Sequence, residues 1–167
     1  FHVVRCCTEA MENARRSFQA SLPKEQRRYF KRSRRLLLAH RDRLSAEDRT
    51  AVDVMLRFSD RLLQAYALKE AFYHFMDAPD RPTALRRLDF WLDACGRLDL
   101  PEFKSCRKTL VNWKPYILNA FDFRLSNGFT EGCNNAIKTL KRVAFGFRNF
   151  RSFRARILLS LSPYPNI

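Results

Sequence analysis

One segment of the chain combines residue types that could do chemistry. It runs from Asn127 to Arg142 as NGFTEGCNNAIKTLKR, and GFRNFRSFR follows from Gly146. Its single acid, Glu131, stands among amide side chains and precedes seven basic residues. A carboxylate in the first turn of a helix interacts favourably with the helix dipole, and that role alone would account for it. Glu131 is therefore either a helix-start acid or a functional carboxylate, and its position does not decide between the two.

Motifs of several common enzyme classes are absent from the sequence. It holds no nucleophile elbow, no phosphate-cradling Gly-rich loop and no HExxH pair. The three histidines are scattered. The five cysteines are odd in number and form no CxxC pair, so we expect reduced thiols, mostly packing residues, rather than a metal cluster. These residues are His2, His40 and His74, and Cys6, Cys7, Cys95, Cys106 and Cys133.

The charge of the chain is high and unevenly distributed. Its 167 residues hold 32 Lys and Arg against 17 Asp and Glu, a formal net charge of +15. Residues 1–50 carry 13 basic and 6 acidic side chains, residues 51–100 carry 7 and 8, and residues 101–167 carry 12 and 3. Like charges in the two flanks repel one another, so we expect them to contact the phosphate backbone of a nucleic acid; two solvated helix faces are the alternative.

Helices must position these residues. Only 4 Gly and 7 Pro are present and 46% of the residues are hydrophobic, which favours helices around a real core over an all-β fold. Apolar residues recur every three or four positions, and Ser45 and Asp80 are typical helix-start residues. The pattern predicts about seven to eight helices near residues 3–22, 24–39, 45–58, 59–76, 80–96, 101–117, 130–140 and 150–161.

Particular residues in these helices have expected places. Leu88 and Trp91 belong to a core stripe, and Trp113 is expected on the core face of the next helix. Gly96 is expected as a C-terminal cap, and Thr130 as the N-cap of the helix that bears Glu131. Residues 117–125 fit a helix or a strand equally well.

The run NGxTEGxNNxIKxxKRxxxGFRxFxxFRxRIL, from Asn127 to Leu158, resembles the C-terminal signature of bacterial insertion-sequence transposases of the ISL-three group. The opening residues FHVVR resemble part of that family's DRFHVVR segment. The helices between the two motifs are similar in character to the family's all-helical insertion. The resemblance therefore spans essentially the whole chain.

The resemblance implies a DDE transposase, in which a ribonuclease H-like core holds two metal ions with two Asp and one Glu. Glu131 would be the third acid, and it would be both a catalytic residue and a metal ligand. His2 would match the histidine after the second acid, near the active site. The implied cofactor is Mg²⁺ or Mn²⁺, because two such ions need ionised oxygen ligands. The DNA-contacting residues would be Asn134, Asn135, Lys138, Lys141, Arg142, Arg148, Arg151 and Arg154.

The family's two Asp residues have no counterpart in this chain, and a lone Glu cannot fix two divalent ions. We therefore expect a fragment that binds DNA, holds no metal by itself and is inactive alone. The fold implied is mainly α: the helical insertion plus the last helices of a ribonuclease H-like core whose sheet is missing. Residues 1–20 would follow the second Asp, residues 21–120 would form the insertion, and residues 121–167 would be the C-terminal core segment.

The expected partner is DNA, both transposon ends and target, with a homodimer left open. No apolar run is long enough to span a membrane and the start does not resemble a signal peptide, so a cytoplasmic, nucleoid-associated protein is expected. Two other functions stay open. One is a non-catalytic basic helical module that binds DNA or RNA, and the other is a protein-interaction bundle with incidental charge.

Overall fold

The computed structural model describes residues 2–123, 128–144, 146–147 and 149–161. These residues form nine α-helices and one short 3₁₀ helix, and no strand occurs among them. The prediction of a mainly α, multi-helix fold is confirmed. The chain divides into two compact units, a first unit of Phe1–Arg124 and a second unit of Leu125–Ile167. Each unit is described by itself.

The first unit contains α1 (His2–Ser21), α2 (Lys24–Arg32), α3 (Arg34–Leu38), η1 (Arg41–Arg43), α4 (Ala46–Leu56), α5 (Asp60–Met76), α6 (Arg81–Leu98) and α7 (Pro101–Phe123). The second contains α8 (Gly128–Val143) and α9 (Phe150–Leu161). The single helix predicted for residues 24–39 is two helices in the structure. The Ser33 hydroxyl donates to the Phe30 carbonyl at 2.9 Å, a local bond that competes with the helical ladder where α2 ends.

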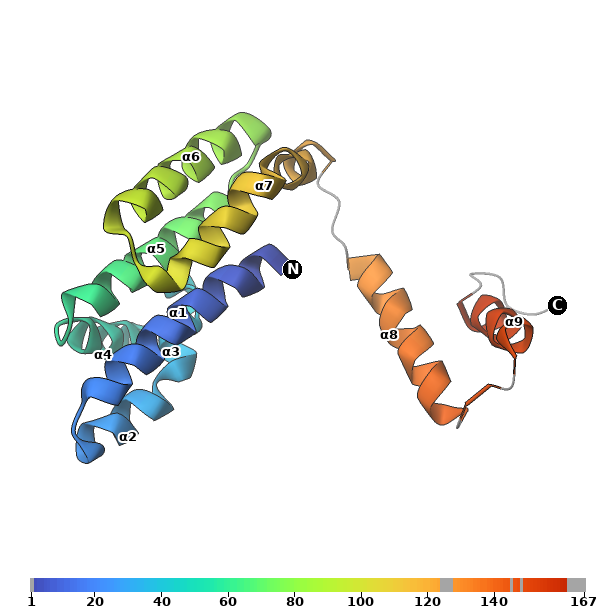
Figure 1. The fold of residues 1–167 in the computed structure, drawn as a ribbon, viewed down its shortest axis with the longest axis horizontal. Helices are drawn as coiled ribbons and strands as arrows, with labels where there is room; N and C mark the ends of the chain where they lie inside the picture. Colours follow the sequence, from blue (N-terminus) through green and yellow to red (C-terminus); the bar gives the residue numbers. More distant parts are fainter. Residues whose placement is uncertain (1, 124–127, 145, 148, 162–167) are drawn as a thin grey trace. The chain divides into compact units, whose positions relative to one another are not determined.

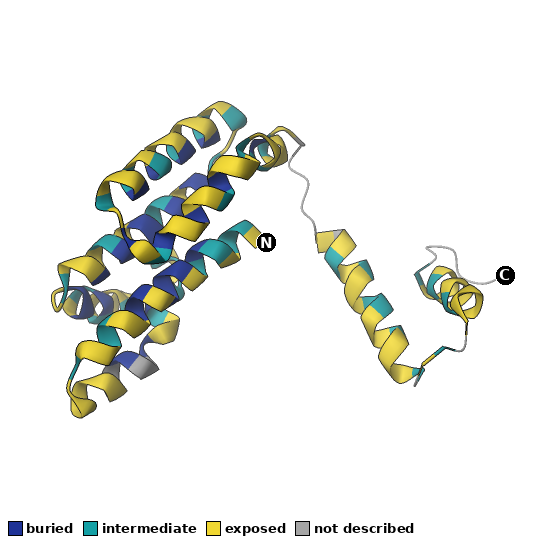
Figure 2. Cartoon of the chain, viewed as in Figure 1, coloured by how far each residue is buried: buried dark blue, intermediate teal, exposed yellow. Residues whose placement is uncertain are grey.

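Four long helices build the core of the first unit. Helix α1 packs against α5 and α7, and α6 packs against the same two helices (Figure 1). The shorter helices α2 and α3 pack against α1, and α4 packs against α5. The buried faces of the long helices turn toward one another, and their outer faces are exposed (Figure 2).

Trp91 occupies the centre of this core. Its side chain is 0% exposed, and its ring centroid lies 5.9 Å from that of Phe72 and 6.4 Å from that of Phe103. The indole N–H donates to the Leu68 carbonyl at 2.8 Å, so the buried polar atom of the ring is satisfied. Leu88 is buried on the same helix, which confirms the predicted stripe.

A buried lysine joins α5 to the end of α3. Lys69 Nζ donates to the Ala39 carbonyl at 2.6 Å and lies 2.5 Å from Glu70 Oε1. The same ammonium lies 3.9 Å from the centroid of the Tyr66 ring. Burial lowers the pKa of Lys69, and the neighbouring Glu70 carboxylate opposes that shift. Because the ammonium satisfies a carbonyl at the C-terminal end of α3, this contact fixes the short helices on the core.

Most predicted helix starts are confirmed. The Ser45 hydroxyl accepts from the Asp48 amide at 3.1 Å, and the Asp80 carboxylate accepts from the Thr83 amide at 2.7 Å. Thr130 is not an N-cap, because α8 already begins at Gly128. The segment that fitted a helix or a strand is helical as far as Phe123, where α7 ends.

The prediction of Gly96 as a C-terminal cap is wrong. Helix α6 continues to Leu98, and Asp99 takes the left-handed conformation at φ 44° and ψ 39°. Asp tolerates this conformation better than most residues, because its short side chain can bond locally. A Cβ at position 96 would lie 3.4 Å from Arg107 Nη2, an ordinary van der Waals contact, so the guanidinium does not require glycine there.

The prediction of Trp113 on the core face of α7 is also wrong. Its side chain is 57% exposed. At this level of the helix the next residue, Lys114, pairs with Asp89 of α6. The buried stripe resumes at Leu118, beyond Pro115. Lys114 is therefore the partly buried residue at this level of α7, and Trp113 is exposed.

All five cysteines are free, as expected. Burial raises the pKa of the Cys7 thiol well above its usual range, and that of Cys95 to about 11. Both side chains are therefore protonated thiols that pack in the core. Among the described residues, no helix is both long enough and apolar enough to cross a membrane.

Candidate nucleic-acid interface around Glu131

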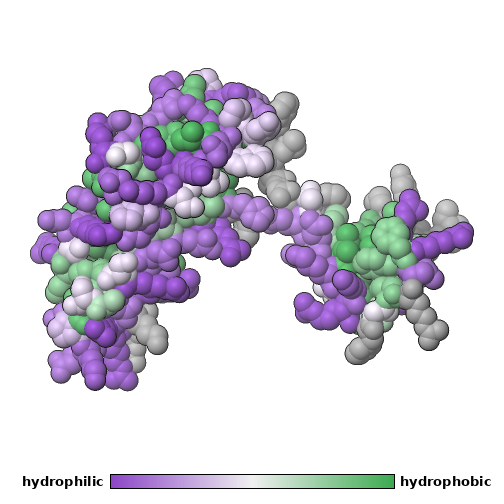
Figure 3. All heavy atoms as spheres, in the orientation of Figure 1, coloured by the Kyte–Doolittle hydropathy of each residue, from purple (hydrophilic) through white to green (hydrophobic). Residues whose placement is uncertain are grey.

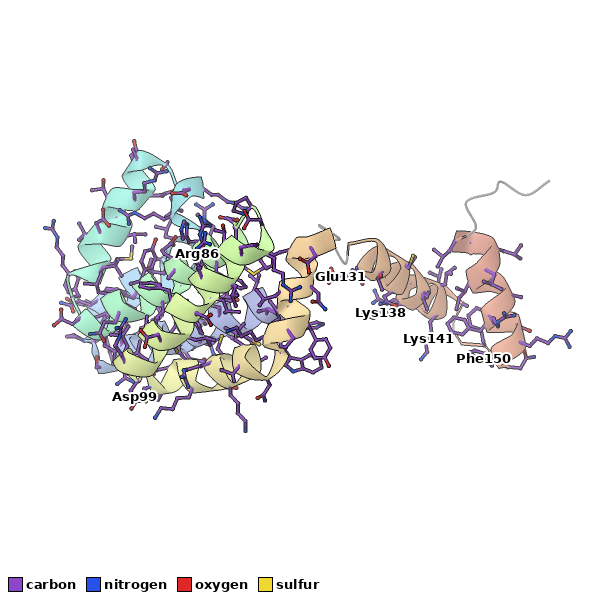
Figure 4. All side chains as sticks on the ribbon, turned by 90° about the horizontal axis from the view of Figure 1, so that it is seen from above. Arg86, Asp99, Glu131, Lys138, Lys141 and Phe150 are labelled. Carbon is purple, nitrogen blue, oxygen red and sulfur yellow. The ribbon has the colours of Figure 1, made fainter. Side chains whose placement is uncertain are left out.

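Helix α8 carries its predicted site residues on one face. From Glu131 onward, polar residues follow at intervals of three and four, and they are Asn134, Asn135, Lys138, Lys141 and Arg142. Since a helix turns once every 3.6 residues, these positions form one stripe about 120° wide. The two amides and the three cations are exposed, and Glu131 is partly exposed. Figure 4 shows Glu131, Lys138 and Lys141 in this order along the helix.

The opposite face of α8 contacts α9. Ile137 and Leu140 are partly buried on α8, as are Phe153 and Ile157 on α9. The rings of Phe147 and Phe153 lie 4.8 Å apart between centroids. These contacts turn the polar stripe of α8 away from α9, toward solvent.

The second unit also exposes apolar side chains. None of its described residues is fully buried. Four large hydrophobic residues are exposed there, and they are Val143, Phe150, Leu158 and Leu159. Figure 3 shows a green, hydrophobic area on this unit bordered by purple, hydrophilic side chains.

The cations of the two units have different surroundings. Every ion pair among the described residues lies in the first unit, and all of them involve residues from position 5 to position 122. The second unit has six described cations, which are Lys138, Lys141, Arg142, Arg151, Arg154 and Arg156. Its single acid is Glu131. The positive charge of this unit is therefore uncompensated within its described part.

The basic flank of the first unit is partly used for structure. Arg27 donates to the carbonyls of Ala20 and Leu22 near the end of α1. Arg41 binds Asp53 through two bonds of 2.8 and 2.9 Å. These two arginines therefore serve the packing of the first unit. The second unit is the stronger candidate for phosphate contacts.

The other predicted site residues belong to different helices. His2 begins α1 in the first unit and is exposed, whereas Glu131 belongs to the second unit. Arg151 and Arg154 are exposed on one side of α9, three residues apart. Arg148 lies outside the described residues.

Sequence reasoning missed one group of cations. Lys104, Arg107 and Lys108 of α7 line a groove of about 530 Å³ beside Asp99. Their spacing of three and four residues was the available signal, because it places them on one face of a helix.

The described residues do not make a two-metal site by themselves. No group of three or more His, Cys, Asp or Glu side chains among them could hold a metal ion. Glu131 has no second carboxylate on its helix. A two-metal site needs several ionised oxygen ligands, of which Glu131 would supply one.

Comparison with known proteins gives consistent matches. The chain is 27% identical to the transposase of insertion sequence element IS1557 from Mycobacterium tuberculosis, over 97% of this chain and 41% of that protein. It is also 27% identical to the transposase of IS1001 from Bordetella parapertussis, over 94% of this chain and 39% of that protein. The chain thus spans about two fifths of the length of these curated transposases.

A third relative carries a different name. An "ATP-dependent protease" from Lactococcus lactis is 34% identical over 65% of this chain and 33% of that protein. That name describes the other protein. No solved structure matches. A family profile described as "Transposase", of the ISL3 (ISL-three) type, matches residues 1–157. The chain therefore belongs to the ISL3-type transposase family.

Proposed function

We propose that the chain is the DNA-binding, C-terminal part of a DDE transposase, and that its second unit binds the phosphate backbone of duplex DNA. The observation that carries the proposal is the set of six described, exposed cations that have no carboxylate partner on α8 and α9. Phosphate contacts by Lys and Arg release counterions, which is the main source of affinity in such interfaces. DNA as partner agrees with the transposase family.

The polar stripe of α8 would face the DNA. Lys138, Lys141 and Arg142 would contact phosphates, and the amides of Asn134 and Asn135 could donate to phosphate or sugar oxygens. Arg151 and Arg154 of α9 would add further phosphate contacts, as would Arg148. Glu131 stands at the start of the same stripe, so a DNA strand held there would pass near its carboxylate.

A matched pair of variants tests this surface. K138Q/K141Q/R142Q removes three cations from the stripe, and R5Q/R57Q/R97Q removes three exposed cations from the first unit. We expect the first variant to bind duplex DNA at least tenfold more weakly than the unaltered chain at moderate salt, and the second to bind within about threefold, as judged by fluorescence anisotropy. Equal losses in the two variants would remove α8 from the interface.

We further propose that Glu131 is the third carboxylate of a catalytic centre whose two Asp residues lie outside residues 1–167. Residues 1–167 alone are then expected to nick DNA no faster than background in Mg²⁺. Mixing them with a polypeptide that supplies the Asp-bearing segment should restore metal binding, and E131Q should abolish the restoration. Robust cleavage by the chain alone that E131Q removes would overturn this assignment.

The non-catalytic DNA- or RNA-binding module is the competing function. It predicts the same salt-dependent binding, because its phosphate contacts would be the same. It differs in predicting no metal binding after mixing with the Asp-bearing segment. The mixing experiment therefore separates the two functions.

A further inference from the structure

Helix α7 carries a second basic surface, in the first unit. The groove of about 530 Å³ is lined by Lys104, Arg107, Lys108 and Asn112, with Asp99 at its edge. Figure 4 shows Asp99 in this unit, before the start of α7. Lys104 pairs with Asp99 at 3.1 Å, and Arg107 Nε donates to the Leu92 carbonyl at 3.0 Å. Lys108 and the remaining N–H groups of Arg107 are left to bind an anion.

An exposed aromatic pair continues the same helix. Trp113 is 57% and Tyr116 67% exposed, and their ring centroids lie 5.5 Å apart. The residues Lys104, Lys108, Asn112 and Tyr116 recur every four positions. They therefore follow one ridge of the helix, with steps of about 6 Å along its axis. Lys104 and Lys108 occupy one end of this ridge and Tyr116 occupies the other, with Trp113 beside Tyr116, about 60° further around the helix.

Acidic residues do not neutralise this ridge. Helix α7 has two acids of its own, Glu102 and Asp122. Arg61 of α5 binds Glu102, and Arg81 of α6 binds Asp122. Asp99 is therefore the carboxylate that lines the groove, against three cations. The groove keeps an excess of positive charge, which is complementary to phosphate.

We propose that this ridge of α7 binds an unpaired strand of DNA. The phosphates would lie against Lys104, Arg107 and Lys108, and a base would stack on Trp113 and Tyr116. Basic grooves combined with exposed aromatic rings are the usual means of binding single strands, because every base offers a π-face. In a duplex those faces are covered by neighbouring bases, so the aromatic pair selects the unpaired state.

This inference rests on the proposed function for the identity of its ligand, DNA, and adds a second surface and the state of the strand. Trp113 was predicted in the core from sequence periodicity, but the side chain is exposed. A large exposed aromatic pair beside cations indicates an interaction surface, because soluble proteins bury most of their large aromatic rings.

The two tryptophans of the chain make the test local. Trp91 is 0% exposed, so a stacked base can quench the fluorescence of Trp113 alone. The probe is an oligothymidylate of about twenty nucleotides, titrated into the full chain in the K138Q/K141Q/R142Q background, which removes the main cations of α8. We expect quenching of Trp113 and saturable binding.

Four variants are compared in that background. Affinities of the variants are measured by fluorescence anisotropy of a labelled oligothymidylate, because the Trp113 variants lack the quenched tryptophan. W113A/Y116A should bind about 5–150-fold more weakly, which corresponds to about 1–3 kcal/mol of stacking per base. W113F/Y116F keeps the stacking surface and should bind within about threefold. K104Q/K108Q should weaken binding and reduce the salt slope by about 0.7 for each phosphate that is no longer neutralised. F90A is the matched control, because Phe90 is a 62% exposed aromatic beside Arg86 and Arg87 on α6.

The outcomes are distinct. Absence of single-strand binding, or unchanged binding by W113A/Y116A, overturns the inference and would fit a face covered by protein. An equal loss in F90A also overturns it, because the effect would not be specific to α7. Duplex binding is measured separately on the chain with α8 intact, so its failure would contradict the proposed function and leave the quenching of Trp113 as evidence for the ridge.

Discussion

Glu131 is the single acid in a surface of cations. If the stripe of α8 binds phosphate, the Glu131 carboxylate repels the same phosphate. Its presence therefore lowers the affinity for DNA. We expect E131Q to bind duplex DNA about two- to fivefold more tightly at low salt, since two like charges a few ångströms apart in water repel by about 1 kcal/mol. E131D, which keeps the charge, should bind as the unaltered chain does. Weaker binding by E131Q would instead mean that the carboxylate orders the stripe.

Glu12 is a second informative residue, in the core of the first unit. Its two oxygens accept from Arg15 at 2.8 Å each, and both side chains are buried. The bonds from Arg15 lower the pKa of Glu12 below its ordinary value of 4.5. The unfolded chain therefore takes up this proton more readily. The stability that the pair contributes is complete above pH 4.5 and is lost as the pH falls through the lower, folded pKa.

The Glu12 variant follows from this linkage. E12Q should reduce the free energy of unfolding at pH 7 by about 3 kcal/mol, because Arg15 stays buried without its counter-charge. It should also reduce the loss of stability below pH 4.5, measured by urea unfolding at several pH values. E9Q removes the exposed partner of Arg5 and should change stability by less than about 1 kcal/mol. An unchanged acid profile in E12Q would show that other carboxylates control the acid response.

At the scale of elements, local chemistry predicted where most helices start. Ser45 and Asp80 bond the backbone amides that a helix start leaves unpaired, and such bonds depend on neighbouring residues alone. The helix ends were harder to predict. Helix α6 ends at Leu98, and Asp99 rather than Gly96 takes the left-handed conformation. Both residue types tolerate that conformation, so residue type alone does not decide which position ends the helix.

The candidate site was predicted to a similar degree. The stripe from Glu131 to Arg142 follows from a period of 3.6 residues, and α8 has it. The exposure of Trp113 was harder to predict, because spacings of three and four residues both fit an apolar stripe. In the structure the position nearest the line from Leu110 to Leu118 is Lys114, which pairs with Asp89 of α6. The use of Arg27 and Arg41 within the first unit was also not predicted, since it depends on how the chain turns between α1 and α2 and between η1 and α4.

The elements also differ in how much they bury, which gives a stability prediction. Leu88 of α6 is 0% exposed, and Leu158 of α9 is 55% exposed. L88A should lower the free energy of unfolding of the first unit by about 2–5 kcal/mol, because it leaves a cavity in a packed core. L158A is the matched control and should change stability by less than about 0.5 kcal/mol. Urea unfolding monitored by tryptophan fluorescence measures the stability of the L88A chain. Urea unfolding monitored by circular dichroism measures that of the L158A chain.

The contrary result is as informative. A fully stable L88A chain would mean that α6 is packed differently from the structure, since no cavity would have formed. A strongly destabilised L158A chain would mean that the exposed side of α9 is covered in solution.

At the scale of the whole molecule, the net charge of +15 separates into two kinds. Many cations of the first unit have internal partners: Arg41 pairs with Asp53, for example, and Arg27 bonds backbone carbonyls near the end of α1. The cations of the second unit have no such partners among the described residues. The total charge predicts a polyanionic partner. The absence of ion pairs among the described cations of the second unit indicates that this unit is the surface that binds it. The family membership makes that polyanion DNA in our proposal.

The salt dependence of duplex DNA binding tests this central claim most directly. Each phosphate neutralised contributes about −0.9 to the slope of log K against log salt, so contacts from all six described cations of the second unit would give a slope near −5. The account predicts that K138Q/K141Q/R142Q makes the slope less steep by about 2.7, while R5Q/R57Q/R97Q leaves it unchanged. A slope that the α8 variant does not alter, or that the first-unit variant flattens instead, would contradict it.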